Sequence, residues 1–228
     1  MPSHTDKIYE NELRELREKL LAMGAKVELA IASSVRALVE RDTALARKVE
    51  EDDTEINREE VDIDDCCRRI LALRQPAGSD LRFITTALKI VTDLERMGDL
   101  AVNIAERVVD LNAAPQLGSY ADIVKLADLA QAQLKHALDA FVDGNPSAAQ
   151  VVLKGDELVD AVYLKVFNEL VGLMLEDSKN IRRATALMFV AKHLERLADH
   201  ATNVAEMVIY MVKGTDVRHP HSRGLAEE

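Results

Sequence analysis

The stretch DLERMGDLAVNIAERV at residues 93–108 returns as HLERLADHATNVAEMV at residues 193–208. The offset is 193 − 93 = 100 residues, and it extends upstream, where DLRFITTALKI from Asp80 aligns with NIRRATALMFV from Asn180. Self-similarity over such a length indicates that one structural unit occurs twice. Both copies consist mainly of residues that favour helices, so the repeated unit is predicted to be helical.

Each copy is predicted to contain three helices, from its apolar periodicity and its stop signals. The predicted helices cover residues 6–40, 43–73 and 79–111, and then 119–142, 146–176 and 179–212. Pro and Gly interrupt the periodicity between them, and Pro146 can occupy a first helical turn. The sequence therefore predicts an all-α fold of two tandem three-helix bundles related by internal duplication.

The domain organisation follows from the same pattern. The first three-helix repeat is predicted at residues 1–112 and the second at 119–213, joined by a linker at 113–118 that contains Pro and Gly. The tail at 214–228 has no periodic apolar stripe and is predicted to be disordered.

Composition limits the classes of function. The 228-residue chain has a formal charge of −11, which would repel a nucleic-acid backbone. No apolar run reaches the roughly 20 residues needed to span a bilayer and the N-terminus lacks a signal region, so we expect a cytoplasmic protein. No nucleophile, base and orienting group converge and no phosphate-binding loop occurs, which argues against an enzyme. Cys66 and Cys67 lack a metal-binding spacing and are predicted to be reduced packing residues.

An acidic residue interrupts a predicted core row in the third helix of each copy. The rows are Leu88, Val91, Glu95, Gly98, Val102, Ala105 and Val109 in the first copy, and Met188, Ala191, Glu195, Ala198, Thr202, Ala205 and Ile209 in the second. The steps of three and four residues are typical of a bundle core. Small residues at 98 and 198 would let a neighbouring helix approach closely.

Further oxygen-bearing side chains share a face with these two glutamates. They are Asp99, Asn103 and Glu106 in the first copy and Asp199, Asn203 and Glu206 in the second. The middle helices add Asp53, Asn57, Glu60 and Asp64 in the first copy but only Asp156 and Asp160 in the second, where Tyr163 and Phe167 replace the last two. The second face therefore has fewer potential ligands.

Carboxylates beside a bundle core lose hydration, which costs several kcal/mol unless a cation or hydrogen-bond donors offset it. Bundle proteins hold Fe, Mn or Zn with Glu and Asp from facing helices. We therefore predict metal sites of unequal strength, with Asn103, Glu106, Asn203 and Glu206 as possible additional ligands. The predicted ligands are Glu95, Asp99, Glu195, Asp199, Asp53, Glu60, Asp64, Asp156 and Asp160.

Two alternatives stay open for the acidic faces. Arg82, Arg96, Arg182 and Arg196 could pair with the acids as structural or partner-facing residues, or the faces could lie in solvent. His193 and His200 flank the second motif, but neither forms the Glu-x-x-His pair of di-metal bundles.

Several segments together resemble the PhoU family. ERMGD at 95–99 and ERLAD at 195–199 are similar to its Glu-Arg-Ile-Gly-Asp signature, and RQPAGSDLR at 74–82 to its Arg-Gln-Pro-x-x-x-Asp-Leu-Arg connection. MLEDSKNI from Met174, VKGTDVRH from Val212 and the opening segment extend the likeness over nearly the whole chain. The second signature departs from the family in having Ala198 where Gly is usual.

The resemblance implies a fold, a metal site and a role. Members of the family are duplicated three-helix bundles, and several bind metal clusters through Glu/Asp-x-x-x-Asp motifs, which here correspond to Glu95 with Asp99 and Glu195 with Asp199. The family acts as a negative regulator between the high-affinity phosphate ABC transporter and a membrane sensor histidine kinase. A non-catalytic homodimeric adaptor, bound to the transporter ATPase subunit and the kinase and touching the membrane only through them, is therefore expected. The alternatives are a metal-storage or redox bundle and a helical scaffold without a cation.

Overall fold

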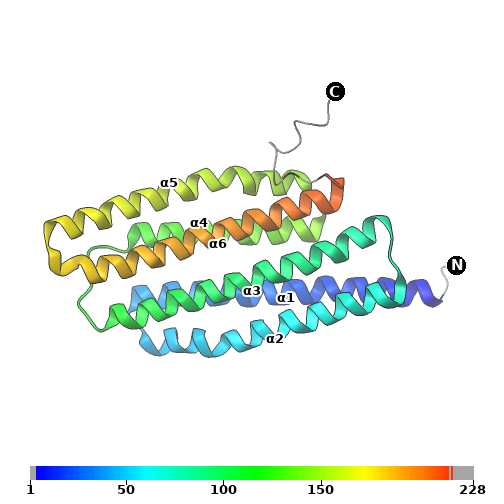
Figure 1. Cartoon of the computed structure of the whole chain (residues 1–228), viewed down its shortest axis with the longest axis horizontal. Helices are drawn as coiled ribbons and strands as arrows, with labels where there is room; N and C mark the ends of the chain where they lie inside the picture. The colour runs from blue at the N-terminus through cyan, green and yellow to red at the C-terminus, as the bar shows by residue number, and fades with distance from the viewer. Residues whose placement is uncertain (1–3, 216, 218–228) are drawn as a thin grey trace, which may run out of the picture.

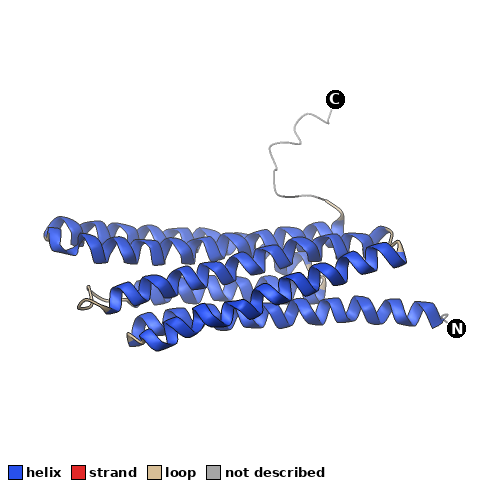
Figure 2. Ribbon diagram, turned by 60° about the horizontal axis from the view of Figure 1, so that its bottom comes forward, coloured by secondary structure: helices blue, strands red, loops and turns tan. Residues whose placement is uncertain are grey.

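The computed structural model describes residues 4–215 and 217, and every regular element in this part of the chain is a helix. The elements are α1 (His4–Glu40), α2 (Thr43–Arg74), α3 (Gly78–Asn112), α4 (Ala121–Asp143), α5 (Pro146–Glu176), the short 3₁₀ helix η1 (Ser178–Asn180) and α6 (Ile181–Lys213). The long helices lie side by side with nearly aligned axes (Figures 1 and 2). The predicted all-α fold is confirmed, and each predicted end of a long helix lies within two residues of the observed one.

Local chemistry fixes the sharp turns between consecutive helices. The Asp42 carboxylate accepts hydrogen bonds from the backbone N–H groups of Ala44 and Leu45, each at 2.9 Å, and so caps the start of α2. Asn145 caps α5 in the same way, directly before Pro146. Gly144 ends α4 with a φ of 56°, in the left-handed region that favours glycine. These caps let neighbouring helices reverse direction within a few residues.

The two copies of the unit pack against each other as well as internally. Helices α1, α2 and α3 contact one another, and so do α4, α5 and α6. Contacts of α3 with α6 and of α1 with α4 join the two groups, so one continuous apolar core runs through both. The third helix of each copy is therefore covered on several sides.

The connection between the copies is held in place by arginines. The Arg41 guanidinium donates to the carbonyl oxygens of Leu111, Asn112 and Ala114, at the end of α3. Arg183 of α6 donates to the Pro115 carbonyl oxygen at 2.9 Å. The predicted linker is thus hydrogen-bonded to both copies. Most of the predicted tail lies outside the described residues.

One fully buried row of each third helix lies one position before the predicted row. In α3 this row consists of Ala87, Ile90, Leu94, Met97, Ala101, Ile104 and Val108, and its counterpart in α6 of Leu187, Val190, Leu194, Leu197, Ala201, Val204 and Val208. The predicted rows were wrong in part: Val91, Gly98 and Ala105 are buried, but Leu88, Glu95 and Val102 are only half-buried. Glu95 and Glu195 therefore lie at the border of the core instead of inside it.

The two cysteines are free thiols within the core, as the sequence predicted. Burial raises the pKa of both thiols, and that of Cys67 reaches about 12. A thiol with so high a pKa is protonated at neutral pH and unreactive. Cys66 and Cys67 therefore act as packing residues of α2.

Candidate functional site

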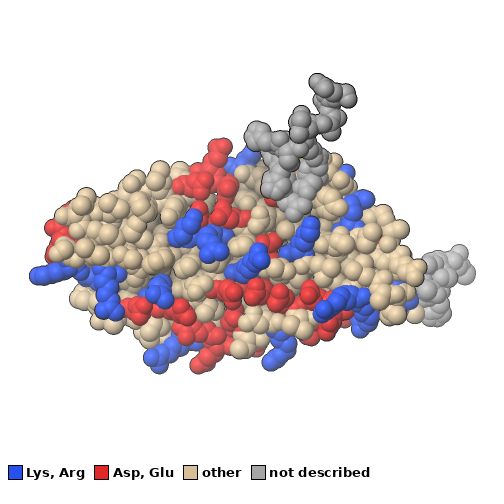
Figure 3. All heavy atoms as spheres, viewed as in Figure 1, with Lys and Arg blue, Asp and Glu red and all other residues tan. Residues whose placement is uncertain are grey.

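Five predicted ligands meet where α2 packs on α3, and we call them the first acidic face. Its members are Asp53, Glu60 and Asp64 of α2 and Glu95 and Asp99 of α3. In the view of Figure 3, acidic side chains gather over α2 and α3 and in a smaller group over α5, with Lys and Arg between them. The structure therefore brings together carboxylates that lie about 40 residues apart in the sequence.

The carboxylates of the first acidic face perturb one another. Burial raises the pKa of Glu95, and the charges of Asp99, Glu60 and Asp53 raise it further. Burial likewise raises the pKa of Glu60, with Asp64 and Asp99 adding to the effect. Burial also raises the pKa of Asp53, although a hydrogen bond from Asn57 lowers it. A cluster that resists holding all its negative charges at once is one that a cation would stabilise.

The Asp53 side chain carries the clearest unmet interaction of this face. Asn57 Nδ2 donates to its Oδ2 at 2.8 Å. Its other oxygen, Oδ1, is buried and has no hydrogen-bond partner among the described residues. A buried carboxylate oxygen without a partner costs about 1–3 kcal/mol, more when charged, so a donor or a cation at this position would be favourable.

Gly98 makes the close approach of α2 and α3 possible. A Cβ atom added there would lie 3.1 Å from Asp53 Oδ1 and 3.2 Å from Ile56 Cδ1. Both distances are shorter than ordinary van der Waals contacts, so a larger side chain would displace the two helices. The sequence-based reading of this glycine as an approach point is confirmed.

Replacing Gly98 by Leu is expected to destabilise the protein by about 1–3 kcal/mol, because the new side chain has no space beside Asp53 and Ile56. Urea unfolding followed by circular dichroism would measure the loss. Gly172→Ala in α5 is the matched control, since nothing lies within 4 Å of its added Cβ. That change is expected to stabilise by about 0.5–1 kcal/mol. A Gly98→Leu protein as stable as wild type would contradict the close packing.

The second acidic face lies where α5 packs on α6 and consists of Asp156, Asp160, Glu195 and Asp199. Burial and the charges of the other three raise the pKa of Asp156 to about 6. In the described part of the chain, a lysine forms an ion pair with this face but not with the first. Lys192 Nζ lies 2.7 Å from Glu195 Oε1 and 2.6 Å from Glu195 Oε2. The second face is therefore partly neutralised by the chain itself.

Replacing Asp156 by Asn is expected to stabilise metal-free protein at pH 7.5. The folded pKa of about 6 lies above the ordinary value of 3.8, so the folded state binds the proton more tightly and ionisation costs stability. The full shift corresponds to ~3 kcal/mol, which solvent screening of this half-exposed group reduces to about 1 kcal/mol.

The gain from Asp156→Asn should shrink as the pH falls through 6 and vanish near 4, because the wild-type carboxyl group then becomes protonated. Urea unfolding at several pH values in EDTA measures it. Asp128→Asn, on the exposed side of α4, serves as the control and should change stability by less than about 0.5 kcal/mol throughout. A gain that is independent of pH would contradict the raised pKa.

Two of the other predicted face residues contact groups outside the two carboxylate clusters. Asn203 Nδ2 donates towards Asp93 Oδ1 at 3.5 Å, and Glu106 pairs with Arg107 at 3.4 Å. Asn103 and Glu206 are half-buried. Within residues 4–215 and 217, no three His, Cys, Asp or Glu side chains are arranged to hold a metal ion as they stand. Metal binding thus stays a prediction that requires carboxylates to turn towards a common point.

The four arginines considered as partners of the acids form no ion pair with them in the described part of the chain. Arg82 Nε donates to the Met211 carbonyl oxygen at 3.0 Å, which joins α3 to the end of α6. Arg96, Arg182 and Arg196 are exposed. The arginine pairing is therefore absent among these residues. The side chain that pairs with Glu195 is Lys192, which sequence reasoning missed.

Sequence reasoning also missed a buried contact between the two copies. His200 Nδ1 lies 2.7 Å from Asp93 Oδ1, and both side chains are almost fully buried between α3 and α6. The contact has no counterpart under the 100-residue repeat, since His193 matches Asp93 and Leu100 matches His200. That asymmetry was the available signal for both missed features, because Lys192 likewise aligns with Thr92.

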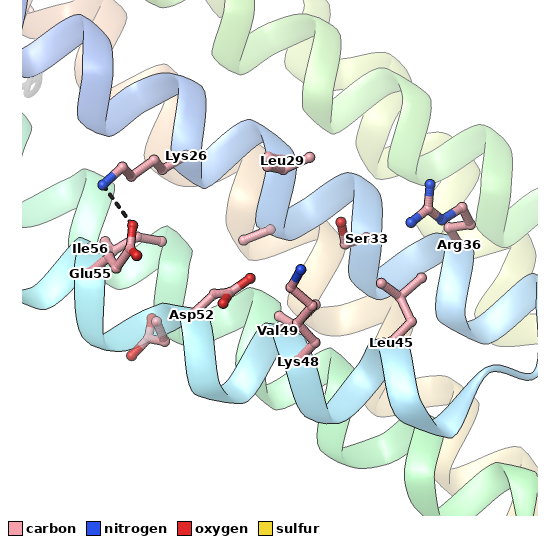
Figure 4. A pocket seen from close by; sticks show the side chains of 12 residues that line it. Lys26, Leu29, Ser33, Arg36, Leu45, Lys48, Val49, Asp52, Glu55 and Ile56 are labelled. Atoms are coloured by element: carbon pink, nitrogen blue, oxygen red, sulfur yellow. Dashed lines mark hydrogen bonds and ion pairs between the residues drawn. The ribbon is translucent and has the colours of Figure 1, made fainter.

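A groove of about 310 Å³ runs between α1 and α2, beside the first acidic face (Figure 4). Its walls carry Lys26, Arg36 and Lys48 together with Asp52 and Asp53. Figure 4 shows Lys26 reaching across from α1 to Glu55 of α2, with a contact of 2.9 Å, and the same ammonium group lies 2.9 Å from Glu59. The groove presents charges of both signs, which suits a polar protein segment better than a small apolar ligand.

None of the helices in the described part of the chain combines the length and the apolar character that crossing a bilayer requires. The sequence matches the family model described as PhoU domain twice, over residues 20–108 and 123–208. A relative from Pseudomonas putida is named phosphate-specific transport system accessory protein PhoU homolog. It is 42% identical over 219 residues, which cover 95% of this chain and 85% of the relative.

Other relatives and solved structures agree with this match. A relative of the same name from Pseudomonas aeruginosa is 41% identical over 228 residues, or 99% of this chain and 93% of the relative. The crystal structure of PhoU from Pseudomonas aeruginosa superposes with a TM-score of 0.87 at 41% identity, covering 91% of this chain and 100% of that one. The crystal structure of the phosphate transport system regulatory protein PhoU from Streptococcus pneumoniae superposes with a TM-score of 0.85 at 31% identity, covering 92% of this chain and 99% of that one.

Proposed function

The chain belongs to the PhoU family, and on that basis we propose that it is a negative regulator of phosphate uptake and of the phosphate-starvation response. The observation that carries the proposal is the match of both copies to the family, together with relatives named as accessory and regulatory proteins of phosphate transport. An accessory protein that regulates a transporter acts by binding and need not catalyse a reaction. The protein is therefore proposed to be a non-catalytic adaptor.

The proposed partners are the ATPase subunit of the phosphate ABC transporter and the sensor histidine kinase of the phosphate two-component system. The protein would act in the cytoplasm, as a homodimer, and reach the membrane only through these partners. The groove between α1 and α2 supports such binding, because its Arg36, Lys48 and Asp52 offer charges of both signs to a protein surface.

Deletion of the gene tests the regulatory role directly. Loss of a negative regulator should raise alkaline phosphatase activity and phosphate uptake in phosphate-rich medium, and a plasmid copy of the wild-type gene should restore repression. Normal repression in the deletion strain would overturn the proposal. A pull-down with the transporter and the kinase, at high and at low phosphate, would identify the partner that the adaptor binds in each state.

A second proposal concerns the first acidic face, as a site for Fe, Mn or Zn held by Asp53, Glu60, Asp64, Glu95 and Asp99. The partnerless Asp53 Oδ1 and the mutually raised pKa values of Asp53, Glu60 and Glu95 favour a cation here. A bound metal ion would supply positive charge that fixes α2 against α3. The alternative function, metal storage, would require substantial loading with metal.

Glu95→Ala separates the two proposals. If this variant loses metal but retains phosphate repression, then the metal has a structural role outside regulation. If it loses both, metal binding is part of the signal. Purified protein that stays empty after loading with Fe, Mn and Zn would overturn the metal proposal and leave the regulatory one standing.

A further inference from the structure

The second acidic face already contains a cation that belongs to the chain. The Lys192 ammonium group contacts both carboxylate oxygens of Glu195, at 2.7 and 2.6 Å. The Glu195 side chain is only 12% exposed, so the positive charge of Lys192 offsets part of the hydration that the carboxylate has lost. Lys192 Nζ also lies 5.3 Å from the centre of the Tyr163 ring, a distance at which an aromatic face attracts a cation.

The first acidic face lacks both of these features. In the first copy, Thr92 takes the position of Lys192 and bears no charge. Its hydroxyl group donates to the Leu88 carbonyl oxygen at 3.2 Å. Glu95, the counterpart of Glu195, has no ion pair in the part of the chain that the structure describes. Under the 103-residue offset of the middle helices (155 − 52), Tyr163 of the second copy takes the position of Glu60 in the first. An aromatic ring that attracts an ammonium group thus stands where the first face has a carboxylate.

Charge makes the two faces unequal towards metal ions. The five carboxylates of the first face have no lysine ion-paired to them among the described residues, whereas the second face brings four carboxylates together with Lys192, which pairs with Glu195. A divalent ion that entered the second face would have to displace the ammonium group from Glu195 or lie beside it. Two cations a few ångströms apart repel strongly in a partly buried site.

We propose that the Lys192 ammonium group takes the place of a metal ion at the second acidic face, so that only the first acidic face binds a metal cation. The two copies then have different means of neutralising the same motif: an exchangeable ion in the first and a built-in lysine in the second. The inference rests on the metal-binding part of the proposed function. It assigns Lys192 as the residue that determines which copy takes metal.

Reciprocal exchange of residues 92 and 192 tests this assignment. Purified full-length protein, stripped of metal with EDTA, is titrated with Mn²⁺, and free Mn²⁺ is counted by electron paramagnetic resonance, with Zn²⁺ in a parallel titration. As single substitutions in the otherwise unchanged chain, Glu95→Gln should abolish Mn²⁺ binding and Glu195→Gln should leave it unchanged. Lys192→Thr should double the amount of Mn²⁺ bound per chain. Thr92→Lys should weaken binding to the first face at least about tenfold, because the new ammonium group lies three residues before Glu95.

Controls separate charge from packing. Lys192→Met removes the charge and keeps most of the stem, so it should also open the second face, whereas Lys125→Thr at an exposed position of α4 should change nothing. Circular dichroism and thermal unfolding establish that each variant is folded.

Either of two results would overturn the inference alone: wild type binding Mn²⁺ equally at both faces, or Lys192→Thr and Lys192→Met leaving the amount unchanged. If neither Mn²⁺ nor Zn²⁺ binds to wild type or to any variant, the metal-binding part of the proposed function fails together with the inference.

Discussion

Phe141→Ala is expected to lower the free energy of unfolding by about 3–5 kcal/mol, the usual cost of removing a buried phenyl ring and leaving a cavity. Phe141 of α4 has no exposed surface and stacks on Phe83 of α3, with ring centres 5.7 Å apart and planes inclined by 13°. The Arg17 guanidinium of α1 lies 5.2 Å from the Phe83 ring. The aromatic pair therefore joins helices of both copies, and losing it should weaken their contact.

Urea unfolding of Phe141→Ala, Phe83→Ala and the double variant measures this contact. The stability losses of the two single variants, added together, should exceed the loss of the double variant by about 0.5–1.5 kcal/mol, which is the coupling expected for a stacked pair. Phe189→Ala makes the same chemical change at a side chain that is 52% exposed, and it should cost less than about 1 kcal/mol. A Phe141→Ala protein that loses no more stability than Phe189→Ala would contradict the proposed core.

Helix positions followed from the sequence because their signals are local. Asp42, Asn145 and Pro146 mark helix starts through interactions with residues two or three positions away, so a reader of the sequence can place them. The repeat added the topology, since two matching units of three helices restrict the possible arrangements. The helix caps and the repeat can both be recognised without knowing which residues far apart in the sequence contact each other.

The core row of α3 was misplaced by one residue because this helix is buried on more than one side. Contacts with α1, α2 and α6 bury Leu94 and Met97 fully, and they also bury Val91 and Gly98 on the adjacent row. A helix with two apolar rows gives an ambiguous periodicity, and the sequence alone does not tell which row faces the centre. The consequence for the site is that Glu95 is half-exposed, which leaves it accessible to a cation.

The carboxylates were found from their spacing, but their neutralising partners were not. Glu95 with Asp99 and Glu195 with Asp199 are visible as a repeated pattern on one helix face. Which cation lies near Glu195 depends on side-chain geometry, and four arginines were more conspicuous in the sequence than Lys192. Contacts across the interface between the copies, such as Asp93 with His200, depend on the packing of α3 on α6, which no local pattern encodes.

His200→Leu is expected to destabilise the protein by about 3–5 kcal/mol, the cost of removing one partner from a buried polar pair. The Asp93 and His200 side chains are only 7% and 11% exposed, and their contact is 2.7 Å long. Leu is the residue that the first copy has at the equivalent position, Leu100, so the size of the replacement suits a helix of this kind. The change leaves the Asp93 carboxylate buried, with Asn203 at 3.5 Å as its remaining donor.

The double variant Asp93→Leu/His200→Leu distinguishes a lost pair from poor packing. Apolar replacement of both partners of a buried pair is often neutral or stabilising, so the double variant should recover most of the stability that His200→Leu loses. His193→Leu is the matched control, because the Nδ1 atom of His193 has no hydrogen-bond partner in the described residues, and its loss should cost less than about 1 kcal/mol. A double variant as unstable as His200→Leu would show that packing, and not the pair, carries the effect.

The position of this pair connects stability with the candidate sites. Asp93 lies two residues before Glu95 of the first acidic face, and His200 directly follows Asp199 of the second. A contact that fixes α3 against α6 at this level therefore also fixes the distance between the two faces. If the faces act together, His200→Leu should weaken Mn²⁺ binding at the first face even under conditions where the variant remains folded, and the double variant should restore it. Unchanged Mn²⁺ affinity in folded His200→Leu protein would show instead that each acidic face is positioned by its own pair of helices.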